Sequence, residues 1–163
     1  FSQYFVRFIY RHTKVIIMIN KENLETTGRL NITVFSGDGN IKSSIDLDNL
    51  VVTTGRDWLA DRSVSNPTAM SHMATGTGTT IPALADTTLE TELARVSLSS
   101  SSSLDNTATF TAAFNAGVST GILTEAGILN AATGGTMLCR TTFPVINIQA
   151  ADSISITWTI TIS

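Results

Sequence analysis

The chain has a single cysteine, two histidines and few charged side chains, and each shortage excludes a class of site. Cys139 cannot form an intrachain disulfide, and a zinc site with two or more cysteine ligands is excluded by number alone. Charged residues make up 14% of the sequence, against about 25% in an average soluble domain. We therefore expect stability to come from packing and from assembly.

Serine and threonine supply the polarity that charged residues do not, and together they account for about a quarter of the chain. Threonine is β-branched and packs well on a pleated surface. A strand face with many hydroxyls and few charges can also be buried against a partner at modest desolvation cost. The composition therefore favours a β protein that self-associates.

The charges are unevenly distributed along the sequence. Arg7, Arg11 and Lys14 lie in the first seventeen residues, which contain no acidic residue. The other seven basic residues face all 13 acidic ones, so residues 18–163 carry a net charge of -6. No cluster of lysine and arginine could follow a phosphate backbone, and we expect no nucleic-acid partner.

Residues 1–17 differ in composition from residues 18–163, which we interpret as one domain of ordinary length. Three interpretations of this basic, aromatic extension stay open. It is a targeting segment or membrane-surface helix, an arm that packs on a neighbouring subunit, or an extension upstream of a start at Met18. The apolar run at 15–19 is too short for a signal or a membrane span, and we favour the last interpretation.

Alternation of apolar and polar residues predicts most of the chain to be extended. It is clearest at the end, where Ile154, Ile156, Trp158, Ile160 and Ile162 alternate with hydroxyl residues. The other predicted elements are a hairpin from 30 to 52 around a turn at 37–40, a short helix at 55–63, a short strand at 71–75, a strand from Ala94, a flexible serine linker at 99–103, and a meander of 107–115, 122–129 and 136–143.

This pattern predicts an all-β fold, an antiparallel, jelly-roll-like β-sandwich with one short helix and long end loops. Catalytic candidates are few. His72 has no motif around it, and although Asp86, Glu90, Glu92 and Glu125 could converge as glycosidase carboxylates, nothing in their spacing indicates it. We expect no enzyme activity, no metal and no cofactor.

Two groups of residues stand out as sites. The first is the loop of Gly76, Thr77, Gly78, Thr79 and Thr80, which lacks the ending of a phosphate-binding loop. We expect its glycines to supply positive φ angles or close backbone approach. With Trp58, this loop is the candidate interface or ligand surface.

The second group is Arg95, Glu125 and Arg140, each of which lies inside an apolar run where an unpaired charge is costly to bury. We expect the three to pair with one another as a structural polar network. The alternative is that they form a polar ligand site.

Several sequence segments carry a resemblance to small virion proteins of tailed bacteriophages, of tail-fibre-like or head-associated type. They are NLVVTTG at 49–55, MATGTGTT at 73–80, Asp86 and Thr87 with Leu89 and Glu92 to Arg95, TEAGILN at 124–130, GTMLCR at 135–140 and ITWTI at 156–160. The resemblance implies a β-rich, oligomeric structural protein of the virion, made in the host cytoplasm, with no catalytic residues. The segment before Met18 departs from the pattern.

The leading hypothesis is therefore a non-enzymatic virion protein that forms a homo-oligomer, which we expect to be a trimer. It would dock on the capsid as a decoration or cement protein, or on the tail as a fibre or baseplate component. Its partners are other virion proteins, not membrane. The alternative hypothesis is a lectin-like module of a phage fibre, in which Trp58 and the loops bind host glycans.

Overall fold

The computed structural model describes residues 4–10, 13–19 and 25–163, and it is mostly antiparallel β. Tyr4–Tyr10 (β1) and Thr13–Ile19 (β2) form a two-stranded antiparallel sheet. The membrane-surface helix considered for this extension is therefore wrong, because both described segments are strands. No helix in the described part of the chain has the length and apolar character needed to cross a membrane.

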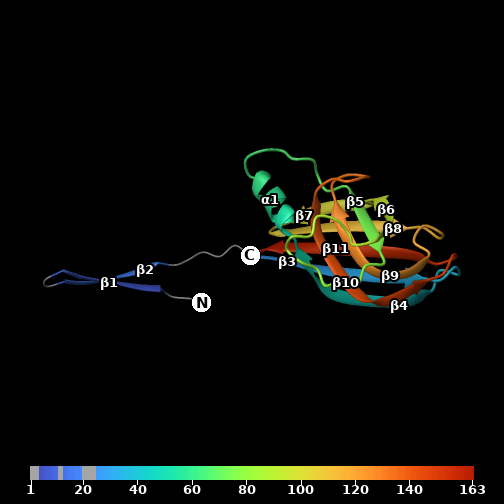
Figure 1. Cartoon of the computed structure of the whole chain (residues 1–163), viewed down its shortest axis with the longest axis horizontal. Helices are drawn as coiled ribbons and strands as arrows, with labels where there is room; N and C mark the ends of the chain where they lie inside the picture. The colour runs from blue at the N-terminus through green and yellow to red at the C-terminus, as the bar shows by residue number, and fades with distance from the viewer. Residues whose placement is uncertain (1–3, 11–12, 20–24) are drawn as a thin grey trace.

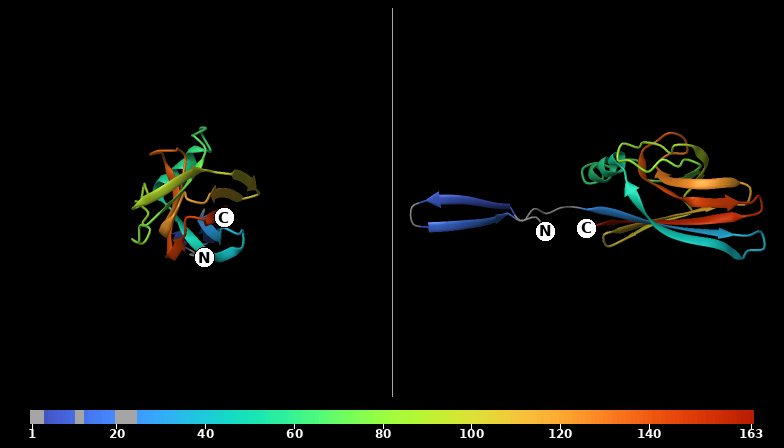
Figure 2. Two further views of the ribbon diagram at one scale, coloured as in Figure 1. Left: turned by 90° about the vertical axis from the view of Figure 1, so that its right-hand side faces the viewer. Right: turned by 60° about the horizontal axis from the view of Figure 1, so that its bottom comes forward.

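The other nine strands form one antiparallel sheet that curls on itself (Figures 1 and 2). Their order across the sheet is β6-β5-β9-β10-β4-β3-β11-β8-β7. The strands are Thr26–Phe35 (β3), Ile41–Val51 (β4), His72–Gly76 (β5), Glu92–Ser97 (β6), Ser100–Leu104 (β7), Thr107–Phe114 (β8), Gly121–Leu129 (β9), Met137–Ile148 (β10) and Ser153–Ile162 (β11).

The curl brings the two edges of this sheet together. β6 and β7 are the outermost strands at opposite ends of the order, yet only Leu98 and Ser99 separate them in the chain. The Leu98 amide donates to the carbonyl of Ser71, next to β5, at 2.8 Å, and the Ser99 amide donates to the carbonyl of Thr111 in β8 at 2.7 Å. One edge therefore passes directly into the other.

The core lies inside the curl, and four inward side chains of β11 lie in it, those of Ile154, Ile156, Trp158 and Ile160. Trp158 and Ile156 are fully buried, and they pair across the strand with Phe110 and Ala112 of β8 and with Leu30 and Ile32 of β3. The predicted alternation of this strand is confirmed by its burial pattern. The predicted hairpin from 30 to 52 is also found, as β3 and β4.

The single helix of the described residues, Thr53–Asp61 (α1), lies at the same end of the sheet as the C-terminus (Figures 1 and 2). It begins two residues earlier than predicted. It packs closely on β10, where a Cβ atom on Gly55 would lie 2.0 Å from the carbonyl oxygen of Leu138. Glycine is required here because no side chain fits between helix and strand.

Two predictions fail in the described structure. Of the predicted meander, the pairing of 122–129 with 136–143 is confirmed as β9 with β10, but the first run is not part of it, because β8 pairs with β11 and β7. The serine linker is instead strand β7, joined to β8 by a tight turn in which Asp105 has a φ of 51°. Backbone pairing needs no apolar side chain, so a run of serines can form a strand beside a neighbour whose register is fixed.

Removing a core side chain from β11 should destabilise the whole domain. We expect Ile156→Ala to lower the free energy of unfolding by about 2–5 kcal/mol, because a fully buried isoleucine leaves a cavity. Thr157→Ala, one residue away on the outer face, should cost less than about 1 kcal/mol. Denaturant unfolding followed by circular dichroism measures both, and equal costs would contradict the assignment of the inner face.

Candidate functional site

The candidate site is built around two charged side chains buried on neighbouring strands. Glu125 lies on β9 and Arg140 on β10, and their exposed fractions are 0% and 2%. The Arg140 Nε atom donates to Glu125 Oε2 at 2.9 Å, and Nη2 lies 2.9 Å from the same oxygen. The structure thus brings together two of the three residues predicted to pair.

The Glu125 carboxylate also holds both ends of the loop between β5 and β6. Its Oε1 atom accepts from the amides of Gly78 at 2.9 Å and Thr91 at 2.7 Å. Its Oε2 atom accepts from the amide of Glu90 at 3.0 Å. With Arg140, four donors surround one carboxylate, which satisfies the hydrogen-bonding requirement of a buried charge.

The glycines of the loop are needed because the backbone runs against this carboxylate. A Cβ atom would lie 2.6 Å from Glu125 Oε1 at Gly76 and 2.5 Å from it at Gly78. Neither glycine is among the residues with positive φ. Of the two roles predicted for them, close backbone approach is therefore the one that the geometry assigns.

Asp86 and Glu90 complete the network at the surface. Arg140 Nη1 donates to Asp86 Oδ2 at 2.8 Å, and Nη2 lies 3.6 Å from Glu90 Oε2. Although burial favours the neutral form of Arg140, its hydrogen bonds to Asp86 and Glu125 raise its pKa. Glu90 accepts from the Thr80 amide at 2.8 Å and from the Thr80 hydroxyl at 2.9 Å.

Arg140, Glu125, Asp86 and Glu90 together form what we call the Arg140 cluster. Its one guanidinium and three carboxylates give it a formal charge of -2. Glu125 is sealed, while Asp86 and Glu90 line a pocket of about 380 Å³ together with Thr80, Thr87, Thr88 and Leu89. Three of the four carboxylates considered for a glycosidase therefore do converge, but around an arginine that binds them. The arrangement holds a loop in one shape, since the polar atoms of Glu125 are all engaged.

Arg95 does not join this network. It pairs with Glu92, with its Nη2 atom 2.6 Å from Glu92 Oε2, and its Nη1 atom donates to the carbonyls of Ala131 and Gly134. Strands β5 and β9 lie between β6 and β10. At the usual strand spacing, the backbone of Arg95 lies about 14 Å from that of Arg140, and the Arg95 side chain is engaged by Glu92 and by the two carbonyls.

Trp58 makes its contacts away from the glycine loop. Its Nε1 atom donates to the carbonyl of Thr68 at 2.9 Å, and the Arg62 guanidinium lies over the ring, 5.5 Å from its centroid. His72 lies between two hydroxyls, with Ser71 Oγ 2.8 Å from Nδ1 and Ser97 Oγ 3.4 Å from Nε2. Neither residue faces the Arg140 cluster's carboxylates in these contacts.

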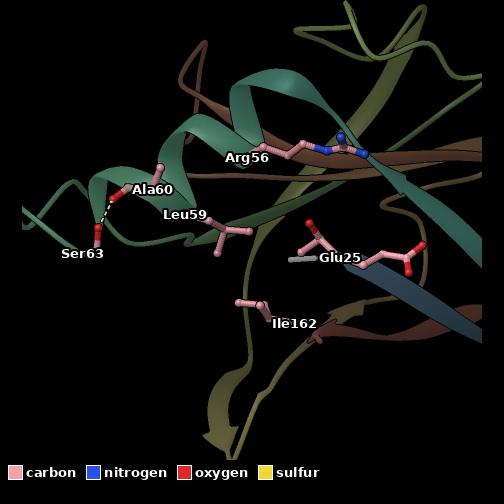
Figure 3. A pocket seen from close by; sticks show the side chains of 7 residues that line it. Glu25, Arg56, Leu59, Ala60, Ser63 and Ile162 are labelled. Atoms are coloured by element: carbon pink, nitrogen blue, oxygen red, sulfur yellow. Dashed lines mark hydrogen bonds between the residues drawn. The ribbon is translucent and has the colours of Figure 1, made fainter. Parts of the chain in front are cut away.

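A larger pocket of about 750 Å³ lies between α1 and the ends of β3 and β11 (Figure 3). Leu59 and Ile162 form its apolar wall, and its charged residues are Glu25 and Arg56. Arg56 Nε donates to the carbonyl of Val51 at 3.2 Å. Because the Arg140 cluster gathers more interacting charges, we take that cluster as the candidate site.

Asp86 and Glu90 were not predicted as partners of Arg140, because they lie in a loop without periodicity. The only available signal was their position shortly after the two glycines.

Within the described residues, no group of three histidine, cysteine, aspartate or glutamate side chains is arranged to hold a metal ion. Comparisons of the chain with protein-family models, curated proteins and solved structures found no match.

Replacing Glu125 by glutamine should release the loop. The amide nitrogen of the substituted side chain would face N–H donors that now point at a carboxylate oxygen. We expect Glu125→Gln to lower the free energy of unfolding by about 3–5 kcal/mol, as when one partner of a buried ion pair is removed. Glu92→Gln, which breaks the more exposed pair with Arg95, should cost about 1 kcal/mol or less. Similar losses in the two variants, measured by denaturant unfolding, would contradict the anchoring role.

The Thr80 end of the loop should loosen in acid. Hydrogen bonds from the Thr80 amide and hydroxyl hold the pKa of Glu90 below its ordinary value of 4.5. A lowered pKa means that this contribution to stability is complete above 4.5 and is lost as the pH falls through the folded-state pKa. We expect the Thr80 amide proton shift to titrate with a midpoint below 4.5. Glu90→Gln should abolish that transition, and an unchanged transition would exclude Glu90 as its source.

Proposed function

We propose that this chain is a non-enzymatic structural protein of a bacteriophage particle, which self-associates and docks on the capsid or the tail. The observation that carries the proposal is that the buried charges of Glu125 and Arg140 fix the shape of a surface loop. Sequence resemblance supplies the phage context. Made in the host cytoplasm, the protein would reside in the virion with other virion proteins as partners.

The loop that the network fixes presents apolar side chains to solvent. Ile81 is 82% exposed and Leu84 is 46% exposed, between the two anchored ends of the loop. The Thr53 amide, at the start of α1, donates to the carbonyl of Leu84 at 2.9 Å and ties the middle of the loop to the helix. An ordered apolar tip loses little conformational entropy on binding, which suits a docking surface.

We interpret the curled sheet as a jelly-roll-like sandwich whose two layers are the halves of the curl. This interpretation supports a structural role because the outward positions of strands such as β11 carry hydroxyls, which tolerate burial against another subunit. A trimer remains our expectation for the homo-oligomer. Decoration of the capsid and a place in the tail are the two sites in the particle that the proposal allows.

The lectin-like alternative has less support from the geometry. Glycan sites commonly use an open aromatic face beside polar groups. One face of Trp58 is occupied by Arg62, and its N–H is donated to Thr68. We therefore place docking between proteins ahead of glycan binding.

The proposal predicts that the chain is found in purified phage particles and that Ile81 is needed for its incorporation. We expect Ile81→Asp to reduce the amount of the chain in particles several-fold, because a charge at the tip must be desolvated on docking. Quantitative mass spectrometry of purified particles measures this. Val64→Asp is the matched control, since Val64 is 85% exposed and lies in a different loop.

Incorporation unaffected by Ile81→Asp would exclude the loop tip as the docking surface, and absence of the wild-type chain from particles would overturn the virion role. The number of copies of the chain per particle distinguishes a position on the capsid from a position on the tail. A number close to that of the major capsid protein indicates decoration. A number close to that of the tail fibre proteins indicates the tail.

A further inference from the structure

The free edges of the nine-stranded sheet differ in how they are protected against pairing with another chain. An unpaired edge presents backbone donors and acceptors, and natural edges are usually blocked by charges, proline or bulges. β6 carries the ion pair of Glu92 and Arg95 on its edge. β4 and β10 pair only at Leu50 and Val51 of β4, and the two strands diverge beyond that point. The diverging part of β4 carries three charged residues, Lys42, Asp46 and Asp48. The diverging part of β10 is irregular and contains the exposed Pro144.

β7 has none of these protections. Its residues are four serines and Leu104, with no charge and no proline, and its pairing with β8 has no register shift. All five residues are exposed, and Leu104 is 76% exposed. β7 is therefore ordered by backbone pairing with β8 on one side, without burial of its own side chains, while its other side has no neighbouring strand among the described residues.

We propose that β7 is a self-association edge, which pairs in antiparallel fashion with β7 of a second copy across a two-fold axis. This inference rests on the self-association in the proposed function and names the surface. The partner is a second copy because the proposed function requires self-association, and β7 is the uncharged edge of a domain whose residues 18–163 carry a net charge of -6. Two acidic domains can approach along a neutral strand without bringing like charges into contact.

The antiparallel arrangement follows from Asp105, which directly follows β7. With Ser102 opposite Ser102 of the second copy, each Asp105 lies opposite Ser99, so the two aspartates are about 20 Å apart. That separation exceeds the Debye length of about 8 Å at physiological ionic strength. A parallel pairing would place the two Asp105 side chains side by side. The two-fold pairing gives a dimer at this edge, so a trimer would need a different surface.

A charge at the centre of β7 tests this pairing. Ser102→Lys places two like charges directly opposite each other, which destabilises a strand pair. We expect it to raise the Kd of self-association about tenfold or more, measured by mass photometry and sedimentation. Thr133→Lys adds the same charge on an exposed turn and should leave the Kd unchanged. Circular dichroism checks that both variants are folded.

A cysteine at the same position tests the geometry directly. Side chains opposite one another in an antiparallel pair lie within reach of a disulfide. Ser102→Cys should therefore form a covalent dimer under mild oxidation, whereas Ser65→Cys, in an exposed loop, should not. The native Cys139 gives little background because it is fully buried and burial raises the pKa of its thiol.

The outcomes separate this inference from the broader proposal. An oligomer that is insensitive to Ser102→Lys and shows no preferential linkage through Ser102→Cys overturns pairing through β7, while self-association itself stands. A wild-type chain that stays monomeric at micromolar concentration overturns both. A dimer that is weakened by Ser102→Lys and covalently linked through Ser102→Cys supports pairing through β7.

Discussion

The burial of one face of β11 is the constraint on which the rest of the fold depends. Its inward side chains lie at the centre of the core, with Ile156 and Trp158 fully buried. The strand pairs with β3 along its whole length and with β8 along most of it. Because strand side chains alternate with a period of two, a register slip of one residue would turn this face to solvent. The fixed register of β11 thereby sets which residues of β3 and β8 lie opposite its buried side chains.

Charge is used sparingly and where it determines shape. A buried ion pair is weak evidence for stability, because its desolvation can offset its attraction. What Glu125 and Arg140 add is a single defined conformation of the loop. The Glu125 carboxylate accepts a hydrogen bond from the Gly78 amide at one end of this long loop and another from the Thr91 amide at the other end. An apolar pair in their place would fill the space but would leave those amides without acceptors. The network therefore explains how an irregular segment can present a defined surface.

Alternation is enough to predict β3, β4 and β11, because the two faces of each strand differ in burial and that periodicity is visible in the sequence. β9 is predictable only as an extended apolar run, because its residues 123–129 are buried on both faces. Strand order is not predictable, since nothing in the local sequence of β8 or β9 specifies which strand each will pair with. The candidate site is subject to the same limit, because its contacts depend on strand order. The sequence identifies Glu125, Arg140 and Arg95 alike as charges inside strands. That Arg95 pairs with Glu92 instead depends on the strand order, which places β5 and β9 between β6 and β10. Asp86 and Glu90 reach Arg140 from a loop that has no periodicity.

The serine run shows why composition alone misassigned β7. Serine is common in flexible linkers because its side chain buries little, and β7 indeed buries none of its own. Its structure comes from β8, which is held on its other side by β11, and from the tight turn at Asp105. A strand ordered only through its backbone gives up no side-chain packing when a further strand is added to it. Since an acidic protein that avoids aggregation has reason to charge every edge, the neutral edge of β7 is the place where contact with another chain is least opposed.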